Sequence, residues 1–161
     1  MIIVSNTSPL TNLAAIGQFE LLKKLFGEIH IALGVWEELN AYGKTWPGSR
    51  EVSGADWIVR REAPDRQLVT VLKRDLDRGE AESISLASSL GADAVLLDEK
   101  DGRLAAQRLG LRTIGVLGIL LSAKSKGFIA AVRPNLDMLQ RQAGFYLSPR
   151  LCERMLELAG E

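Results

Sequence analysis

The chain has 161 residues, of which 47% are hydrophobic, which is enough for one buried core and too much for a disordered segment. It carries 20 basic and 20 acidic residues, a balance that argues against a protein coating nucleic acid through bulk positive charge. Cys152 is the only cysteine, which excludes an internal disulfide and a thiolate zinc cluster and favours a reducing compartment such as the cytoplasm.

The predicted strands and helices alternate along the chain, as judged from hydrophobic periodicity and from the glycines that close several helices. In chain order they are strand 2–4, helix 8–14, helix 19–26, strand 29–31, helix 35–42, strand 57–59, helix 67–74, helix 78–90, strand 94–97, helix 100–109, strand 112–114 and helices 117–124, 136–142 and 148–158. Residues 43–56 hold three glycines and a proline without periodicity and are expected to form a long surface loop.

This order predicts an α/β fold, because apolar strands that alternate with helices are typical of a parallel sheet covered on both faces. A single domain over residues 1–161 is expected, with the C-terminal helices of 131–161 packed on it or used to contact a partner. The amino terminus lacks the basic and apolar regions of a signal peptide, and no apolar run approaches the roughly 20 residues of a membrane helix. Neither secretion nor membrane insertion is expected.

Four polar side chains stand at strand ends or on helices, where a ligand cleft of a parallel sheet would form. They are Asn6, Glu38, Glu80 and Asp98, with Glu99 or Asp101 as a further candidate. Each acid taken singly also fits a structural role, as a helix cap, a residue favoured by the helix dipole or a solvated surface acid. Only their combination points to a site.

Helical geometry separates the acids that share a helix. At about 100° per residue, Glu80 falls close to the apolar face of helix 78–90, whereas Glu82 points the opposite way and is expected in solvent. In helix 35–42, Glu38 borders the face formed by Val35, Leu39 and Tyr42, and Glu37 lies outside it. A buried carboxylate needs a partner, so Glu80 is a stronger candidate for a functional residue than Glu82.

Clustered carboxylates repel one another unless a cation offsets them, and an all-oxygen ligand set selects Mg²⁺ or Mn²⁺ over zinc or copper. Such an ion can activate water and bind a phosphate. His30 is expected to be packed in its strand and Cys152 to be a small core side chain. Candidate contacts to such a phosphate are Arg103, Arg108, Arg112, Lys124 and Lys126, and Trp46 is a candidate for stacking on a ligand ring.

With these residues identified, nearly the whole chain resembles PIN-domain nucleases, in particular bacterial proteins related to VapC-type toxins. The matching stretches are residues 2–10 (IIVSNTSPL), 35–39 (VWEEL), 79–82 (GEAE) leading to Leu86 and Ala87, 96–99 (LLDE) through Arg103, Leu104 and Ala105, and 115–120 (GVLGIL). The resemblance implies an α/β/α sandwich around a parallel sheet, an acidic Mg²⁺ or Mn²⁺ site, and cleavage of RNA by a metal-activated water. It places Glu38, Glu80 and Asp98 at acidic positions of the family, with Asp101 or Glu99 as a further ligand. In the toxins that the chain resembles, homodimers are usual and a small antitoxin protein occupies the cleft.

The sequence departs from the family at Asn6, which stands where the family has its first aspartate. An amide oxygen can coordinate a metal but adds no negative charge, so weaker metal binding is expected. The alternative function is therefore a catalytically weakened PIN-like module that acts through RNA or protein contacts. A phosphoryl-accepting domain centred on Asp98 is a third alternative, disfavoured because the chain has no glycine-rich phosphate loop.

Overall fold

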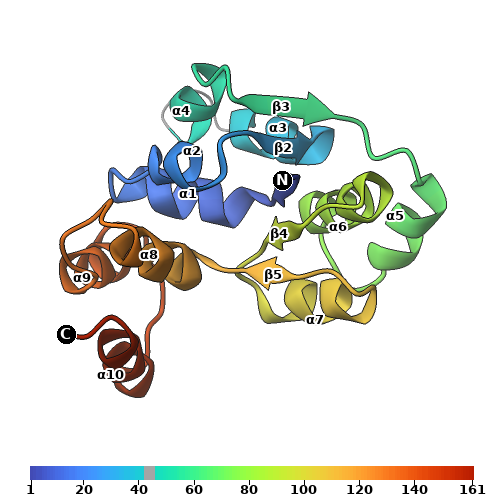
Figure 1. The fold of residues 1–161 in the computed structure, drawn as a ribbon. Coiled ribbons are helices and arrows are strands. Elements are labelled where there is room, and N and C mark those ends of the chain that lie inside the picture. Colours follow the sequence, from blue (N-terminus) through green and yellow to red (C-terminus); the bar gives the residue numbers. More distant parts are fainter. Residues whose placement is uncertain (42–45) are drawn as a thin grey trace.

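A computed structural model describes residues 1–41 and 46–161 and contains a five-stranded parallel sheet (Figure 1). The strands are β1 (Ile3–Ser5), β2 (Ile29–Ala32), β3 (Ile58–Arg61), β4 (Ala94–Leu96) and β5 (Thr113–Ile114), in the spatial order β3-β2-β1-β4-β5. The helices are α1 (Thr7–Ala15), α2 (Leu21–Phe26), α3 (Leu33–Asn40), α4 (Ser49–Ser53), α5 (Arg66–Leu72), α6 (Arg78–Leu90), α7 (Lys100–Arg108), α8 (Val116–Ser125), α9 (Arg133–Arg141) and α10 (Pro149–Leu158). The predicted parallel α/β architecture is confirmed.

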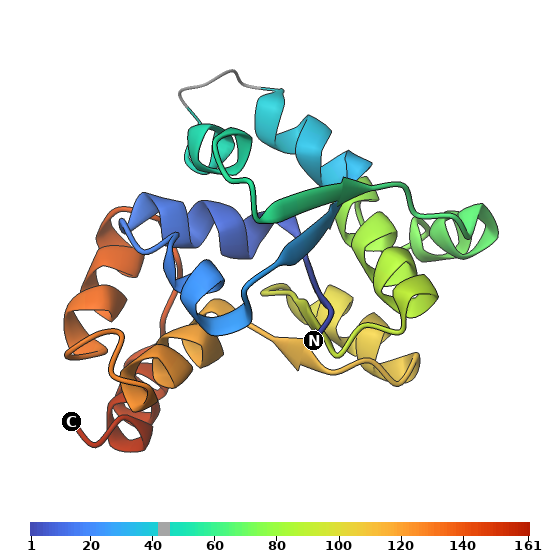
Figure 2. The ribbon, with the colours of Figure 1, turned by 45° about the horizontal axis from the view of Figure 1, so that its top comes forward.

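Alternate residues of each strand face opposite sides of the sheet, and this alternation creates two cores. Ile3 and Leu96 pack into one core with side chains of α1, α2 and α8. Val4 and Val95 pack into the other core, with side chains of α5, α6 and α7. Figures 1 and 2 show the two groups of helices on opposite sides of the strands, so the molecule is an α/β/α sandwich.

The strand order reverses direction at β1. From β1 the chain moves outward through β2 to β3, then returns to place β4 on the other side of β1 and β5 beyond it. In a parallel sheet, ligands bind beyond the carboxyl ends of the strands at such a switch point. The backbone N–H of Asn6 donates to Leu96 O at 3.0 Å, which holds the end of β1 beside the end of β4.

The long loop predicted for residues 43–56 is partly wrong, because α4 lies within it. Gly48 has φ +93°, a left-handed conformation that favours glycine, and its N–H donates to Glu51 Oε2 at 3.0 Å. Val52 then packs into the first core. Residues 42–45, which include Tyr42 of the predicted apolar face, lie outside the described residues.

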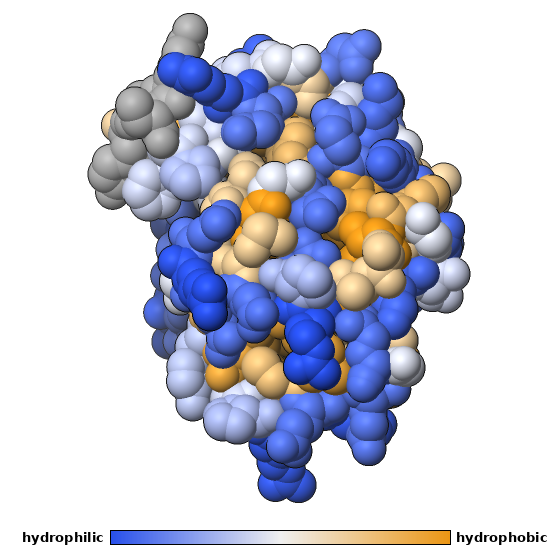
Figure 3. All heavy atoms as spheres, turned by 90° about the vertical axis from the view of Figure 1, so that its left-hand side faces the viewer, coloured by the Kyte–Doolittle hydropathy of each residue, from blue (hydrophilic) through white to orange (hydrophobic). Residues whose placement is uncertain are grey.

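The C-terminal helices are tied to α8 by the last residue of the sequence. Glu161 accepts hydrogen bonds from Lys124 Nζ at 3.0 Å and from Val132 N at 2.7 Å, and Leu136 and Met155 reach the first core. Figure 3 shows the side of the molecule with α9 and α10, where hydrophobic side chains form separate patches among hydrophilic ones. Use of these helices to contact a partner stays a prediction.

Within residues 1–41 and 46–161, none of the helices combines the length and apolar character needed to cross a membrane.

The solvent exposure predicted for Glu82 is wrong, because its side chain is only 2% exposed. α6 is buried along most of its length, since it packs against the sheet, α3, α5 and α7 instead of presenting one face to water. The carboxylate of Glu82 is compensated: it accepts from Arg78 Nε at 2.8 Å and from the backbone N–H of Gly34 at 3.3 Å. Arg78 also pairs with the exposed Glu37 of α3.

Replacement of Glu82 by alanine is expected to lower the free energy of unfolding by about 1–3 kcal/mol, because it leaves the N–H of Gly34 without its acceptor in a buried position. Glu37→Ala removes the other carboxylate on Arg78, but that pair is exposed and its loss should cost about 0–1 kcal/mol. Urea denaturation of both variants measures the difference. Equal losses in the two variants would contradict the structural role given to Glu82.

Candidate active site

The carboxyl ends of β1 and β4 meet the starts of α6 and α7 and the middle of α3, and five polar side chains gather there. We call this group the acidic cluster: Asn6, Glu38, Asp77, Glu80 and Glu99. Three of its side-chain oxygens surround Gly79: a Cβ at that position would lie 2.8 Å from Glu38 Oε2, 3.3 Å from Asn6 Oδ1 and 3.5 Å from Asp77 Oδ1. A side chain at residue 79 would therefore displace at least the Glu38 carboxylate from its present position.

Asn6 follows β1 and is 2% exposed. Its Oδ1 atom is buried and has no hydrogen-bond partner within the described part of the chain, a property it shares with Ser49 Oγ. An unsatisfied buried acceptor costs roughly 1–3 kcal/mol, so this oxygen is available to a ligand that enters the cluster.

Glu38 extends from α3 toward the same point. Its Oε2 accepts a hydrogen bond from Thr7 Oγ1 at 2.8 Å, and Thr7 is the first residue of α1, directly after Asn6. Desolvation raises the pKa of Glu38, and the negative charges of Asp77 and Glu99 raise it further, although the bond from Thr7 opposes them. Thr7 thus fixes the direction of a carboxylate in a strongly negative environment.

Asp77 and Glu80 contact each other at the start of α6. Asp77 is the N-cap residue, whose Oδ1 accepts from Glu80 N at 2.8 Å, and the Glu80 side chain is buried. Burial raises the pKa of Glu80 to about 7, with further contributions from a hydrogen bond to the Asp77 carboxyl and from the charges of Asp77 and Glu99. Asp77 was missed at the sequence level, although an aspartate three residues before a glutamate at a helix start is a capping-box pattern.

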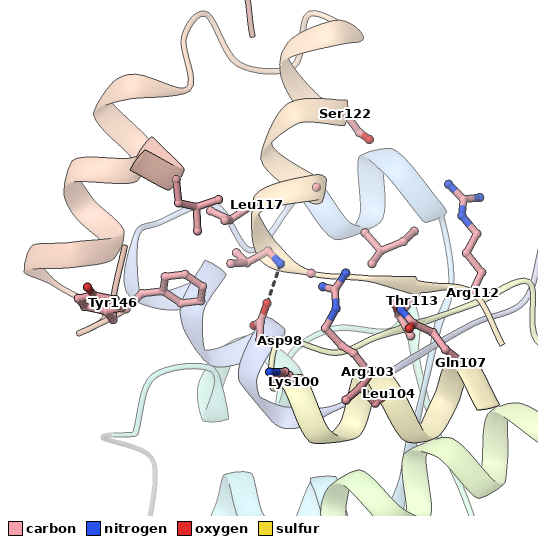
Figure 4. A pocket seen from close by; sticks show the side chains of 16 residues that line it. Asp98, Lys100, Arg103, Leu104, Gln107, Arg112, Thr113, Leu117, Ser122 and Tyr146 are labelled. Carbon is pink, nitrogen blue, oxygen red and sulfur yellow. Dashed lines mark hydrogen bonds between the residues drawn. The ribbon is translucent and has the colours of Figure 1, made fainter. Parts of the chain in front are cut away.

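Asp98 and Glu99 are adjacent in the sequence, but their side chains contact different parts of the molecule. Asp98 Oδ1 accepts from Val116 N at 2.8 Å, at the start of α8 (Figure 4). Asp98 Oδ2 accepts from Asn12 Nδ2 at 3.2 Å. Burial raises the pKa of Asp98 to about 6 despite these two bonds. Glu99 accepts from Ser8 Oγ at 2.7 Å, and its charge raises the pKa values of Glu38 and Glu80, which places it with the acidic cluster.

Asp101, predicted as a further ligand, is not brought to the cluster. It is exposed in the first turn of α7 and lines a separate hollow between α5 and α7, together with Leu68 and Leu104. Of the two alternatives that the sequence left open, Glu99 is the acid that lies near Glu38 and Glu80. Glu99 and Asp101 are only two positions apart, but side chains of successive residues at a helix start point in different directions.

The cluster fits a hard divalent cation. Its donors are carboxylate and amide oxygens, the ligands that Mg²⁺ and Mn²⁺ prefer, and they include the unpartnered oxygen of Asn6. None of its carboxylates is in an ion pair with Lys, Arg or His within residues 1–41 and 46–161, so their charge is uncompensated. Across the same residues no set of three or more acidic, histidine or cysteine side chains is already drawn together tightly enough to enclose an ion.

The single histidine and the single cysteine lie away from this cluster. His30 is buried in β2, where its Nδ1 accepts from Arg61 Nε at 3.0 Å, and burial lowers its pKa. Cys152 is partly buried in α10 and packs against the first core. Both side chains are packed, as predicted.

Comparison with known families decides the assignment that the geometry suggests. The sequence model of the PIN domain matches residues 2–161. The chain belongs to the PIN-domain family. PIN domains are generally nucleases that act with Mg²⁺ or Mn²⁺, which agrees with an acidic cluster at the sheet switch point. None of the curated proteins matches the chain.

The raised pKa of Glu80 predicts how this PIN domain responds to pH. Between the ordinary value of 4.5 and the value of about 7 in the fold, the folded protein keeps a proton that the unfolded chain has released, so the contribution of Glu80 to stability falls as pH rises. With a chelator present, Glu80→Gln should therefore gain stability relative to the wild type as pH rises from 4.5 to 7, and the gain should level off above that. Urea titrations of both proteins across pH measure this difference, and a difference that does not change with pH would contradict it.

Proposed function

We propose that the chain is a metal-dependent endoribonuclease of the VapC toxin type, which hydrolyses RNA phosphodiester bonds at the acidic cluster. The observation that carries the proposal is that the unpartnered amide oxygen of Asn6 lies near Gly79 together with oxygens of Glu38 and Asp77, two carboxylates without an ion pair in the described part of the chain. Such an arrangement is costly unless a cation occupies it, and a divalent cation is what phosphodiester hydrolysis requires.

In this proposal Asn6 Oδ1, Glu38 and Glu80 hold Mg²⁺ or Mn²⁺, with Glu99 at the edge of the site. When bound, the ion supplies an activated water and a positive charge for the phosphate. Thr7 orients Glu38 through its 2.8 Å hydrogen bond. In the metal-free site, Glu80, with a pKa of about 7, can take up or release a proton near neutral pH.

Asp98, predicted as a catalytic residue and metal ligand, receives a different proposed role. Its oxygens accept bonds from Val116 N and Asn12 Nδ2, which belong to α8 and α1. We assign to it the positioning of these helices at the end of β4, beside Glu99. Asp101, exposed on the other side of α7, is left out of the proposed ligand set.

The finer parts of the proposal rest on the sequence resemblance to VapC-type toxins. They are a role in a toxin and antitoxin system, a small antitoxin protein as inhibitor, a homodimer, and action in the cytoplasm. RNA as the substrate agrees with the general behaviour of PIN domains.

The second candidate function is a PIN-like binding module with little or no catalysis, and Asn6 favours it. An amide at the end of β1 offers one ligand oxygen without charge, in a site where the family has an aspartate. The two candidates differ in whether the wild-type site holds an ion tightly enough to cut RNA.

Substitution at neighbouring positions of α3 tests the nuclease proposal. Glu38→Gln should reduce the cleavage of labelled RNA pools in Mn²⁺ or Mg²⁺ by more than the roughly 10- to 100-fold typical of outer-shell changes, because it removes a ligand charge. Glu37→Gln, which alters the adjacent exposed acid, should leave cleavage unchanged. Cleavage by the wild type must also stop in chelator, and cutting that persists there would contradict a metal nuclease.

Asn6→Asp tests the alternative. The added carboxylate should strengthen Mn²⁺ binding, measured as a larger rise in melting temperature with added Mn²⁺ than in the wild type. It should also increase the rate of RNA cleavage. Cutting by Asn6→Asp but not by the wild type would favour the binding module, and an unchanged response to Mn²⁺ would contradict the role given to residue 6.

A further inference from the structure

A second concave feature lies next to the acidic cluster, on the side where Asp98 faces α8. It is a hollow of about 670 Å³ between α7, β5, α8 and the segment before α10. Its wall includes the cationic side chains of Lys100, Arg103 and Arg112, and Tyr146 stands at its edge (Figure 4). We call it the basic hollow.

The basic hollow adjoins a second, smaller hollow that reaches one residue of the acidic cluster, Glu99. This smaller hollow of about 310 Å³ is also lined by Ser8 and Tyr146. The two hollows share Asp98, Phe145 and Tyr146 in their walls. An extended ligand that reaches from Glu99 toward α8 would therefore lie beside Tyr146 and the basic hollow.

The charge of the hollow suits phosphate. Asp98 is the one acidic residue among its lining side chains, and its carboxylate already accepts two hydrogen bonds. Lys100 and Arg112 are exposed, and neither is in an ion pair within the part of the chain that the structure describes. Two cations are thus available to an anionic ligand a short way from the acids that repel it.

Tyr146, which lines both hollows, is suited to stack on a nucleic-acid base. Tyr146 is 84% exposed, whereas the preceding Phe145 is partly buried and packs against the first core. This neighbour fixes the segment to the body of the molecule while the tyrosine ring stands in solvent. A fixed, exposed ring beside phosphate-binding cations is typical of surfaces that bind single-stranded nucleic acid by stacking.

We propose that the basic hollow binds the single-stranded RNA segment next to the phosphate to be cut, with Tyr146 stacked on a base and Lys100 and Arg112 bound to phosphates. The inference rests on the proposed function, because it concerns the substrate of the same site. Arg108, a candidate RNA contact from the sequence, is excluded from this role, since it lines the hollow between α5 and α7 with Leu68 and Leu104.

Equilibrium binding in chelator tests the inference without cleavage. The probe is a fluorescently labelled single-stranded RNA of mixed sequence and about 12 nucleotides, read by anisotropy over a range of salt concentrations. Tyr146→Ala should weaken binding by about 5- to 100-fold, and Tyr146→Phe should bind like the wild type because the ring is kept. The double variant Lys100→Gln, Arg112→Gln should lower the slope of log K against log salt by about 0.7 for each RNA phosphate that the protein no longer neutralises.

The matched control removes the same charge elsewhere. Lys73→Gln with Arg74→Gln changes two exposed cations outside the basic hollow and should leave affinity and salt slope unchanged. An equal loss in this control, an unaffected Tyr146→Ala variant, or no binding of RNA by the wild type would each overturn the inference.

The experiments distinguish failure of the RNA-binding inference from failure of the proposed nuclease activity. Binding that weakens as expected in a protein that cuts no RNA would retain the basic hollow and reject the proposed activity. Cleavage that is metal-dependent, with hollow variants that bind and cut like the wild type, would retain the activity and reject the hollow.

Discussion

The close approach of α6 to the ends of β1 and α3 is the constraint on which the site depends. Residue 79 has no side chain, and the oxygens of Asn6, Glu38 and Asp77 occupy the space that a β-carbon would contact. The parallel sheet supplies the rest of the geometry, since the strand order reverses at β1 and the carboxyl ends of β1 and β4 lie side by side. A helix packed at this depth carries its carboxylates into the interior.

Glu80 and Glu82 of α6 show that burial of a carboxylate is not enough to mark it as a site residue. Glu82 is more deeply buried than Glu80, yet it is surrounded by the guanidinium of Arg78 and the N–H of Gly34. Glu80 meets another carboxyl, that of Asp77, and no cation. The first arrangement is compensated within the protein and therefore structural, whereas the second leaves a charge for something outside the chain to balance.

The sequence was sufficient to predict the parallel sheet and the helix that ends at Gly91, because local periodicity and caps determine these features. It was insufficient for Glu82, since a helical wheel assumes one buried face and α6 is packed on several sides. It also left Glu99 and Asp101 open as alternatives for a further acid of the site. Glu99 lies near Glu38 and Glu80, whereas Asp101 lines the hollow between α5 and α7, and no local pattern reports how α7 packs.

The raised pKa of Glu80 allows the metal-free cluster to reduce its own negative charge. With a pKa of about 7, Glu80 is protonated in part at neutral pH, which lessens its repulsion with Asp77 and Glu99. In the proposed metal site a cation would take the place of this proton, so metal binding would release a proton and would weaken as the pH falls. Occupancy of the proposed site would then depend on the pH around the protein.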